Sequence, residues 1–373
     1  MALFDENETV APPRRRLSRA TVAGMWALAV ALIVLLALTF LPTSYVIQQP
    51  GPVYNTLGTT AGADGADVPL ISVEGADTFP TDGALDLLTV QVAGNRERTP
   101  SWFELAKAWF DPSKAVMPID AVFPRNQTTE ERNEQSAAMM VDSQNEATAA
   151  ALVELGYDVN PRLSVHSLTD DSAANGILEP GDIILEADGE AVTDAAAMRD
   201  IVNAGDGDPI SILIERDGDE ETVSVTPKEV EVDGEPTWLI GVMLTTEFDF
   251  PFDVTIQLNN VGGPSAGMMF ALGIMDVLTP GELNGGESVA GTGTITADGT
   301  VGPIGGIQQK LWGAVGADAD WFLAPEANCD EVVGHIPDGL RVFSVETLDD
   351  ALDVLDAIRE DGDLDALPTC TAR

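Results

Sequence analysis

The hydrophobic and polar positions along the chain follow different periods in different segments, and each period predicts a different kind of element. The first apolar segment runs from Ala20 to Leu41 and holds 22 residues without a charged side chain. As a helix it would rise about 33 Å, enough to cross a hydrocarbon core of roughly 30 Å. The pattern therefore predicts one membrane-spanning helix over residues 20–41.

Arginines crowd the N-terminal side of this helix, whereas the forty residues after it contain no Lys or Arg. The positive-inside rule leaves residues 1–19 in the cytoplasm and everything after Leu41 outside it. A cleaved signal peptide and a buried core helix are the alternatives. The apolar run is longer than an ordinary signal peptide core, lacks an Ala-x-Ala cleavage site and has no polar face, so we expect a retained anchor.

Residues 42–158 form the next segment, an extracytoplasmic lead with some regular structure. Residues 50–69 are rich in Gly, Pro and Ala and predict irregular chain. Alternation over Ala84–Val92 predicts a strand. A capping-box pattern at Thr128 and Glu131 precedes a long run of helix formers, which predicts one or two helices ending at Gly156.

Residues 159–229 change to short β-rich runs separated by Asp-Gly turns at residues 188–189 and 217–218, with one helix over residues 195–204. This segment resembles a PDZ domain of the type found in bacterial proteases. The resemblance rests on Asp171–Leu178, Pro180–Ile184, Asp188–Gly189 and Arg216–Gly218. It implies peptide recognition by addition of an extended chain to a sheet edge. Residues 155–163 show no equivalent of the carboxylate-binding loop that precedes the first strand in such domains.

Charge excludes several function classes. The chain has 18 Lys and Arg against 62 Asp and Glu, a net charge of −44. Such a surface repels phosphate backbones, so we expect no nucleic-acid partner. With only two His, His166 and His335, and two Cys, we expect neither a zinc cluster nor a His-based active site, and no cofactor or metal. We read both His as structural or exposed.

The two cysteines, Cys329 and Cys370, lie in the part of the chain expected outside the cytoplasm. That compartment favours a disulfide between them, which would fasten the C-terminal tail to the domain. Two unpaired thiols are the alternative.

The strongest local signal for chemistry lies around Ser265, which follows Gly263 and Pro264 and precedes an apolar segment, Ala266–Leu278, predicted to be a buried helix. Unpaired N–H groups at a helix start can stabilise a developing oxyanion. An ordinary Ser N-cap is the commoner meaning of such a residue, so Ser265 alone does not indicate an enzyme.

A second signal is Lys310, which follows Gly305 and Gly306 and stands among apolar residues of a predicted helix. Burial disfavours the ammonium form and would lower the Lys pKa toward the range of a usable base. The alternative is a surface Lys that extends its ammonium to water.

Together the two signals resemble the catalytic domain of the Lon-type serine proteases, which use a Ser-Lys dyad. The motif Gly263-Pro264-Ser265-Ala266-Gly267 matches the nucleophile loop of that family, with the residues around the Ser as loop and oxyanion residues. The Gly305-Gly306-x-x-x-Lys310 motif matches its second signature. The resemblance implies that Ser265 is the nucleophile, that Lys310 is the general base and that Thr292 supports the Lys amine.

The sequence departs from the family pattern at one position and thereby resembles a subgroup of the family. Gly262 stands where most members have an acidic residue. This pattern is similar to membrane-anchored, PDZ-bearing Lon-like proteins of Gram-positive and actinobacterial type, which implies a bacterial cell membrane. None of the four Lys follows a Gly, so no P-loop is present and we expect no ATP requirement. The family also implies a homo-hexameric ring.

The sequence thus predicts an α/β (α+β) Lon-type proteolytic domain over residues 240–373, a PDZ domain over residues 159–229 and one transmembrane helix. The strand at 84–92 is a candidate to complete the catalytic sheet, which would make the PDZ domain an insertion. The expected function is an ATP-independent extracytoplasmic serine endopeptidase acting on flexible or unfolded polypeptides, with the PDZ domain in substrate recognition or gating. The alternatives are a membrane-anchored PDZ scaffold with a non-catalytic Lon-like fold and a nucleotide site at the Gly262–Ser265 helix start.

Overall fold

The computed structural model describes residues 18–62, 65–124, 128–169, 171–192, 195–232, 235–258 and 261–371. Most of the predicted cytoplasmic segment, residues 1–17, and the two Asn at 259–260 lie outside this part of the chain. Contacts divide the chain into two units. The first holds Met1–Gln49 and Val92–Gln127, and the second holds Pro50–Gln91 and Thr128–Arg373.

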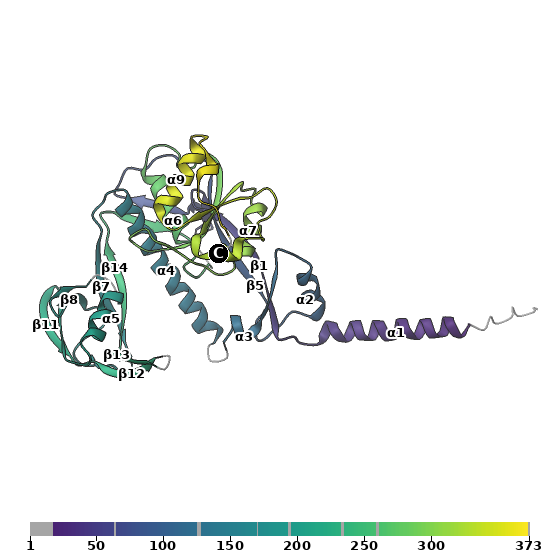
Figure 1. The fold of residues 1–373 in the computed structure, drawn as a ribbon, viewed down its shortest axis with the longest axis horizontal. Helices are drawn as coiled ribbons and strands as arrows, with labels where there is room; N and C mark the ends of the chain where they lie inside the picture. The colour runs from purple at the N-terminus through teal and green to yellow at the C-terminus, as the bar shows by residue number, and fades with distance from the viewer. Residues whose placement is uncertain are drawn as a thin grey trace, which may run out of the picture. The chain divides into compact units, whose positions relative to one another are not determined.

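The first unit begins with α1 (Arg19–Phe40), a single continuous helix of 22 residues (Figure 1). Within the described residues it is the one helix long and apolar enough to cross a membrane, and a signal sequence passes the same test. The unit continues with α2 (Trp102–Trp109), β6 (Ala115–Pro118) and α3 (Ile119–Val122). The start of β1 (Tyr45–Asn55) pairs antiparallel with β6.

The second unit contains a sheet with the strand order β20-β19-β16-β5-β1. The strands are β5 (Ala84–Ala93), β16 (Ser288–Gly291), β19 (Trp321–Pro325) and β20 (Arg341–Val345) together with the end of β1. β16 lies between β5 and β19 and is parallel to both. The predicted strand at 84–92 therefore exists and lies inside this sheet, although almost 200 residues separate it from β16.

Neighbouring residues of a strand point to opposite faces of the sheet. Because apolar residues occur on both faces here, helices cover both of them. Leu87, Val289 and Leu323 share one core with α4 (Thr129–Glu154), α6 (Gly267–Leu278) and α9 (Leu348–Arg359). Leu88 and Ala290 share a second core with α7 (Ile307–Gly316) and α8 (Cys329–Val332). The smaller elements are β2 (Thr59–Ala61), β3 (Asp67–Pro69), β4 (Ile71–Glu74), β15 (Asp253–Ile256), β17 (Thr294–Ile295), β18 (Val301–Gly302) and two 3₁₀ turns at Glu326–Asn328 and Leu364–Ala366.

The long helix predicted after Thr128 is one helix, α4, rather than two. The Thr128 hydroxyl accepts the Glu131 N–H, and the Glu131 carboxylate accepts the Thr128 N–H, so the predicted capping box is present. The helix ends two residues before Gly156. Gly156 has a positive φ of 80°, a conformation that terminates a helix readily only at Gly.

A second sheet has the strand order β11-β10-β8-β7-β14. Its elements are β7 (Asn160–Leu168), β8 (Ile183–Ala187), β9 (Glu190–Ala191), α5 (Ala195–Ala204), β10 (Ile210–Arg216), β11 (Asp219–Val225), the hairpin of β12 (Lys228–Val232) and β13 (Glu235–Leu239), and β14 (Val242–Asp249). Both predicted Asp-Gly turns are present, with positive φ at Asp188 and Asp217. β14 pairs with β7 over its whole length, so this strand lies in the second sheet, although the predicted catalytic domain begins at residue 240.

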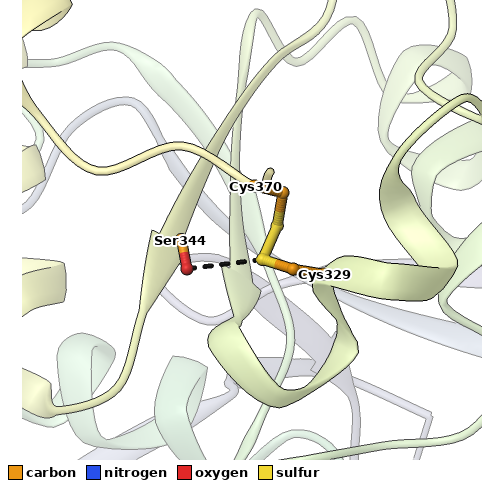
Figure 2. The surroundings of a disulfide bond; sticks show 3 residues. All are labelled: Cys329, Ser344 and Cys370. Carbon is orange, nitrogen blue, oxygen red and sulfur yellow. Dashed lines mark hydrogen bonds between the residues drawn. A yellow bond between two sulfur atoms is a disulfide. The ribbon is translucent and has the colours of Figure 1, made fainter. Parts of the chain in front are cut away.

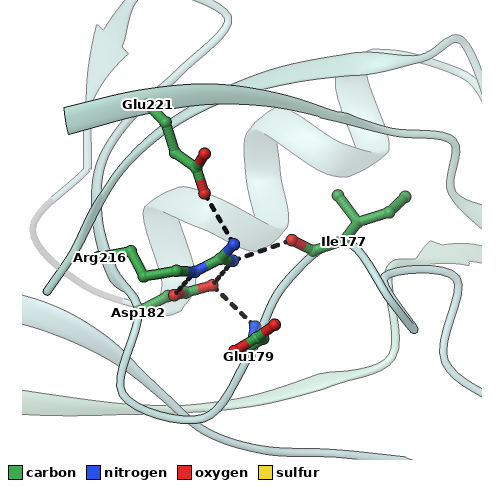
Figure 3. Close-up of polar contacts among 5 residues, drawn as sticks. All are labelled: Ile177, Glu179, Asp182, Arg216 and Glu221. Atoms are coloured by element: carbon green, nitrogen blue, oxygen red, sulfur yellow. Dashed lines mark hydrogen bonds and ion pairs between the residues drawn. The ribbon is translucent and has the colours of Figure 1, made fainter. Parts of the chain in front are cut away.

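An ion pair holds together two of the motifs on which the PDZ resemblance rests (Figure 3). Arg216 donates from Nε and Nη2 to the two carboxylate oxygens of Asp182, each at 2.6 Å, and from Nη2 to the Ile177 carbonyl. The Asp182 side chain is 1% exposed. Its burial raises the pKa, but the hydrogen bonds from Arg216 and from the Glu179 N–H outweigh burial and hold the pKa of Asp182 below its ordinary value.

Replacing Arg216 by Met is expected to loosen this sheet, because it leaves the buried Asp182 carboxylate without its cation, at a cost of about 2–3 kcal/mol. Since the folded pKa of Asp182 is depressed, the stabilisation is present above the unfolded pKa and is lost as the pH falls through the folded pKa. Hydrogen exchange of the β8 and β10 amides in the full chain checks both effects. Arg199→Met, a change in α5 of the same charge, is the control. Equal exchange rates in Arg216→Met and Arg199→Met would contradict a stabilising role for the Arg216–Asp182 ion pair.

The structure joins Cys329 and Cys370 by a disulfide, the pair expected from the predicted compartment (Figure 2). The Cys329 Sγ lies 3.4 Å from the Ser344 hydroxyl of β20. The Ser344 N–H donates to the Pro368 carbonyl, so the tail is held to α8 by the disulfide and to β20 by this hydrogen bond.

Candidate active site

Ser265 lies in a tight turn two residues before the first residue of α6. The N-cap of α6 is Ala266, and it makes no side-chain capping hydrogen bond, so Ser265 is not the ordinary helix cap considered as the alternative. Gly263 has a φ of +88°, which a residue with a Cβ adopts only with strain. The loop thus leaves the Ser265 hydroxyl free of a capping role.

Lys310 lies in the first turn of α7, which begins after Gly306, a residue with a φ of +72°. Ile307, Leu311 and Ala314 of this helix pack into the second core of the sheet. Lys310 points the same way and is 2% exposed, so the alternative of a surface Lys with its ammonium in water is wrong.

The two side chains meet across 45 residues of sequence. The Lys310 Nζ lies 2.7 Å from the Ser265 Oγ and 2.7 Å from the Thr292 Oγ1. The Thr292 hydroxyl donates to the Ser265 carbonyl at 2.8 Å. Because its single proton is used there, the Thr292 oxygen accepts an N–H from the Lys310 amine, and the lone pair of the neutral amine is available to accept the Ser265 proton.

Burial also sets the protonation state of this amine. It lowers the pKa of Lys310 from its ordinary value of 10.5 to about 7. No carboxylate forms an ion pair with Lys310 among the described residues. The site therefore holds a Lys that is substantially neutral near physiological pH, next to a hydroxyl that it can deprotonate.

Some backbone N–H groups of the loop around Ser265 donate hydrogen bonds within the protein, and others do not. The Gly263 N–H donates to the Ser136 carbonyl at 2.9 Å, and the Gly267 N–H donates to the Pro264 carbonyl at 3.4 Å. Pro264 has no N–H. The N–H groups of Ser265 and Ala266 contact no acceptor in the described part of the chain. Of the predicted oxyanion residues, Ala266 is therefore the one that offers a free donor, and Ser265 adds a second.

Sequence reasoning missed the contribution of α4 to this loop. The Ser143 hydroxyl donates to the Pro264 carbonyl at 2.9 Å, and Ser136 binds Gly263 as described above. A Cβ on Gly262 would lie 2.8 Å from the Ser136 Cβ, so only Gly permits this approach. Ser136, Met140 and Ser143 are spaced by four and three residues, which places them on one helix face. That spacing was the available signal.

The site opens into a cleft of about 420 Å³. Residues from five segments line it, namely Pro52, Tyr54, Leu87–Gln91, Met140, Val261, Gly262, Ser265, Ala266, Gly305 and Lys310. Ser265 and Lys310 both line this space, an arrangement that would let them reach a bound chain. His166 and His335 are exposed and lie outside it. No cluster of His, Cys, Asp or Glu suited to a metal ion occurs among the described residues.

A second hollow, of about 330 Å³, lies in the PDZ-like sheet between α5 and the start of β14. Met198 and Val202 of α5 line it together with the Ile240-Gly241-Val242 segment. In PDZ domains the carboxylate-binding loop is expected ahead of the first strand, where residues 155–163 show no equivalent. The loop that borders the hollow instead follows the β12–β13 hairpin. An apolar-Gly-apolar segment between two strand patterns was the signal for it.

Known protein families match both parts of the chain. Residues 259–357 match the Lon protease (S16) C-terminal proteolytic domain, and residues 139–226 match the PDZ domain. Lon protease 1 of Sorangium cellulosum is 39% identical over 93 residues, which cover 24% of this chain and 11% of that protein. Lon protease 2 of Bacillus subtilis is 33% identical over 108 residues, which cover 28% of this chain and 19% of that protein.

The chain thus spans about a tenth to a fifth of the length of these curated relatives. Among solved structures, the PDZ domain of the SdrC-like protein from Listeria monocytogenes is 28% identical, with a TM-score of 0.20, over 22% of this chain and 85% of that one. The predicted resemblance is confirmed: the chain contains a Lon-type proteolytic domain of the serine peptidase class and a PDZ domain. Both kinds of domain imply polypeptide binding.

Proposed function

We propose that the protein is an ATP-independent serine endopeptidase in which Ser265 and Lys310 form the catalytic dyad. The observation that carries the proposal is the 2.7 Å separation between the Lys310 Nζ and the Ser265 Oγ at a site where the Lys is 2% exposed and its pKa is about 7. Burying a Lys costs stability, and perturbed groups of this kind cluster at functional sites; the partner of this Lys is a hydroxyl in a cleft.

The chemistry follows from this geometry. The neutral Lys310 amine accepts the Ser265 proton as the oxygen attacks the scissile carbonyl, and the resulting ammonium gives that proton to the leaving amine. The oxyanion of the tetrahedral intermediate is stabilised by the free N–H groups of Ser265 and Ala266, where one well-placed donor contributes about 3 kcal/mol. A water molecule then repeats the sequence on the acyl-enzyme. Thr292 positions the amine throughout.

The remaining parts of the proposal concern placement. We place the catalytic domain outside the cytoplasm, held to a bacterial membrane by α1, because the charge asymmetry around α1 and the Cys329–Cys370 disulfide both favour that side. The lack of any Gly-Lys step in the sequence supports ATP independence. We keep the predicted domain limits, except that β14 joins the PDZ domain. A homo-hexameric ring remains a proposal by family resemblance.

An ATP-independent peptidase does not unfold its substrates, so we propose unfolded or extended polypeptides as the substrates. The hollow beside Ile240 and Gly241 supports a role for the PDZ domain in binding such chains or gating their access.

The test is covalent labelling of the full chain in detergent micelles without nucleotide. A panel of peptide boronates and fluorophosphonates should modify Ser265, as located by peptide mass spectrometry, and should block hydrolysis of unfolded casein in parallel. Lys310→Met should remove the labelling, because the hydroxyl then has no base. A chain that binds peptides at the PDZ hollow but neither reacts with any probe nor cleaves casein would instead be the scaffold considered as the alternative.

A further inference from the structure

The first structural unit carries a surface that the peptidase mechanism does not use. Residues 92–127 hold five Lys or Arg against four Asp or Glu, whereas the rest of the chain holds 13 against 58. Two of the four Lys in the sequence, Lys107 and Lys114, fall in this short segment. In a chain this acidic, a local excess of cations marks a place where negative charge is accepted.

The segment is tied closely to the end of the predicted membrane helix. Thr43, three residues after α1 ends, donates its hydroxyl to the Pro100 carbonyl at 2.8 Å and its N–H to the Thr99 hydroxyl at 3.2 Å. Residues 99 and 100 lead directly into α2, and α2 contacts α1. If α1 spans a bilayer, these bonds hold α2 at the level of the lipid headgroups.

The surface of α2 suits that position. Leu105 and Ala108 are buried against Ile47, so they form the inner face of the helix. Three aromatic side chains point to solvent instead, namely Phe103 (52% exposed), Trp109 (63%) and Phe110 (89%). The Lys107 ammonium lies over the Phe103 ring, 5.1 Å from its centroid. Exposed aromatic rings interleaved with Lys are typical of segments that lie in the membrane interface.

A polar hollow of about 560 Å³ lies beside this helix within the same unit. Arg98, Lys107 and Lys114 line it, against a single carboxylate, Glu104. Glu104 is already used to cap α2, since it accepts the Ser101 N–H at 2.7 Å and the Ser101 hydroxyl at 2.9 Å. Lys114 pairs with Asp111. The Arg98 guanidinium and the Lys107 ammonium form no ion pair with a carboxylate among the described residues, and they act on Glu104 only through longer-range attraction.

We propose that this hollow binds the phosphate of an anionic phospholipid while Phe103, Trp109 and Phe110 enter the interface of the same leaflet. Arg98 and Lys107 donate to the phosphate oxygens, the geometry for which guanidinium and ammonium groups are suited. The proposal rests on the anchoring part of the proposed function, and it adds a second, lipid-selective attachment. That attachment would fix how the first unit lies on the membrane.

The experiment uses the full chain in nanodiscs of phosphatidylcholine alone or with about one third phosphatidylglycerol, followed by hydrogen exchange. We expect the α2 amides to exchange about tenfold more slowly with phosphatidylglycerol present. Arg98→Gln with Lys107→Gln should abolish the difference, and so should Phe103→Ser with Trp109→Ser and Phe110→Ser. Arg199→Gln with Lys228→Gln, which removes the same charge from the PDZ domain, should retain it. As a control for folding, the α2 amides of each variant should exchange in detergent at the same rate as those of the wild-type protein.

Equal α2 exchange in both lipids, or a lipid effect that survives the Arg98 and Lys107 changes, would overturn the proposal. Protection produced in phosphatidylcholine discs by inorganic phosphate would also overturn it, because the ligand would then be a soluble anion. The α1 amides report on the anchor separately. If they exchange freely in both lipids, α1 is not a membrane anchor, and both the proposed anchoring and the lipid site are disproved. If the α1 amides are protected but the α2 amides are not, only the lipid site is disproved.

Discussion

Replacing Ser265 by Ala, or Lys310 by Met, is expected to lower the rate of peptide hydrolysis by about 10⁴-fold or more, since each change removes one half of a unit that acts together. The Ser265 hydroxyl is a weak nucleophile without a base 2.7 Å away, and the other hydroxyl that the Lys310 amine contacts, that of Thr292, already donates its proton to the Ser265 carbonyl. Hydrolysis of a quenched-fluorescence casein by the full chain gives the measurement.

The pH dependence separates this mechanism from a merely structural role. The base must be neutral, and the pKa of Lys310 is about 7, so the rate should rise with pH through about 7 and level off above it. Lys228→Met, which removes a Lys of the PDZ domain, should keep both rate and profile. Substantial hydrolysis by Ser265→Ala, or a rate that falls as pH rises through 7, would contradict the dyad.

The second large effect is a gain in stability. Lys310→Met should raise the free energy of unfolding of the catalytic domain although it abolishes peptidase activity. The pKa of Lys310 falls from 10.5 to about 7 on folding, which corresponds to a destabilisation of about 5 kcal/mol when the group is charged in both states. Roughly 4 kcal/mol of this remains at pH 7. Thr292 loses a hydrogen-bond partner, worth about 1 kcal/mol, so we expect a net gain of about 3 kcal/mol.

The pH dependence of this gain follows from the same linkage. The cost of the buried ammonium is fully present below pH 7, declines as the folded protein releases the proton, and vanishes above 10.5, where the unfolded chain is neutral too. The advantage of Lys310→Met should therefore shrink between pH 7 and pH 10. Calorimetry of the full chain in detergent, with Lys228→Met as the matched variant, measures it. A Lys310→Met protein that melts below wild type at pH 7 would refute the assigned burial cost.

Local patterns predicted much of the fold. The apolar run of α1, the capping box of α4 and the apolar helix after Ser265 all follow from neighbouring residues, because side-chain spacing and caps act within one or two turns. The boundary predicted at residue 240 separates β14 from the sheet in which it pairs, for the opposite reason. β14 reads locally as one more strand, and its membership in the PDZ sheet depends on hydrogen bonds to β7, some eighty residues earlier.

The same distinction applies to the site. Motif spacing identified Ser265, Lys310 and Thr292 through a family resemblance, but it could not tell a buried Lys from an exposed one. Burial depends on which core the helix face packs against, and that core is built from α7 and from strands more than two hundred residues apart. The hydrogen bonds between α4 and the Gly263–Pro264 loop also became visible only in the folded chain.

By itself, the sequence determined the elements, the acidic surface and the residues able to do peptidase chemistry, because these depend on residue type and short spacing. Only the tertiary structure decided that Lys310 is buried and contacts Ser265, that Thr292 also contacts its amine, and that Arg98 and Lys107 share a hollow beside α2. Desolvation and hydrogen-bond direction are properties of a three-dimensional environment, and no linear pattern encodes them alone.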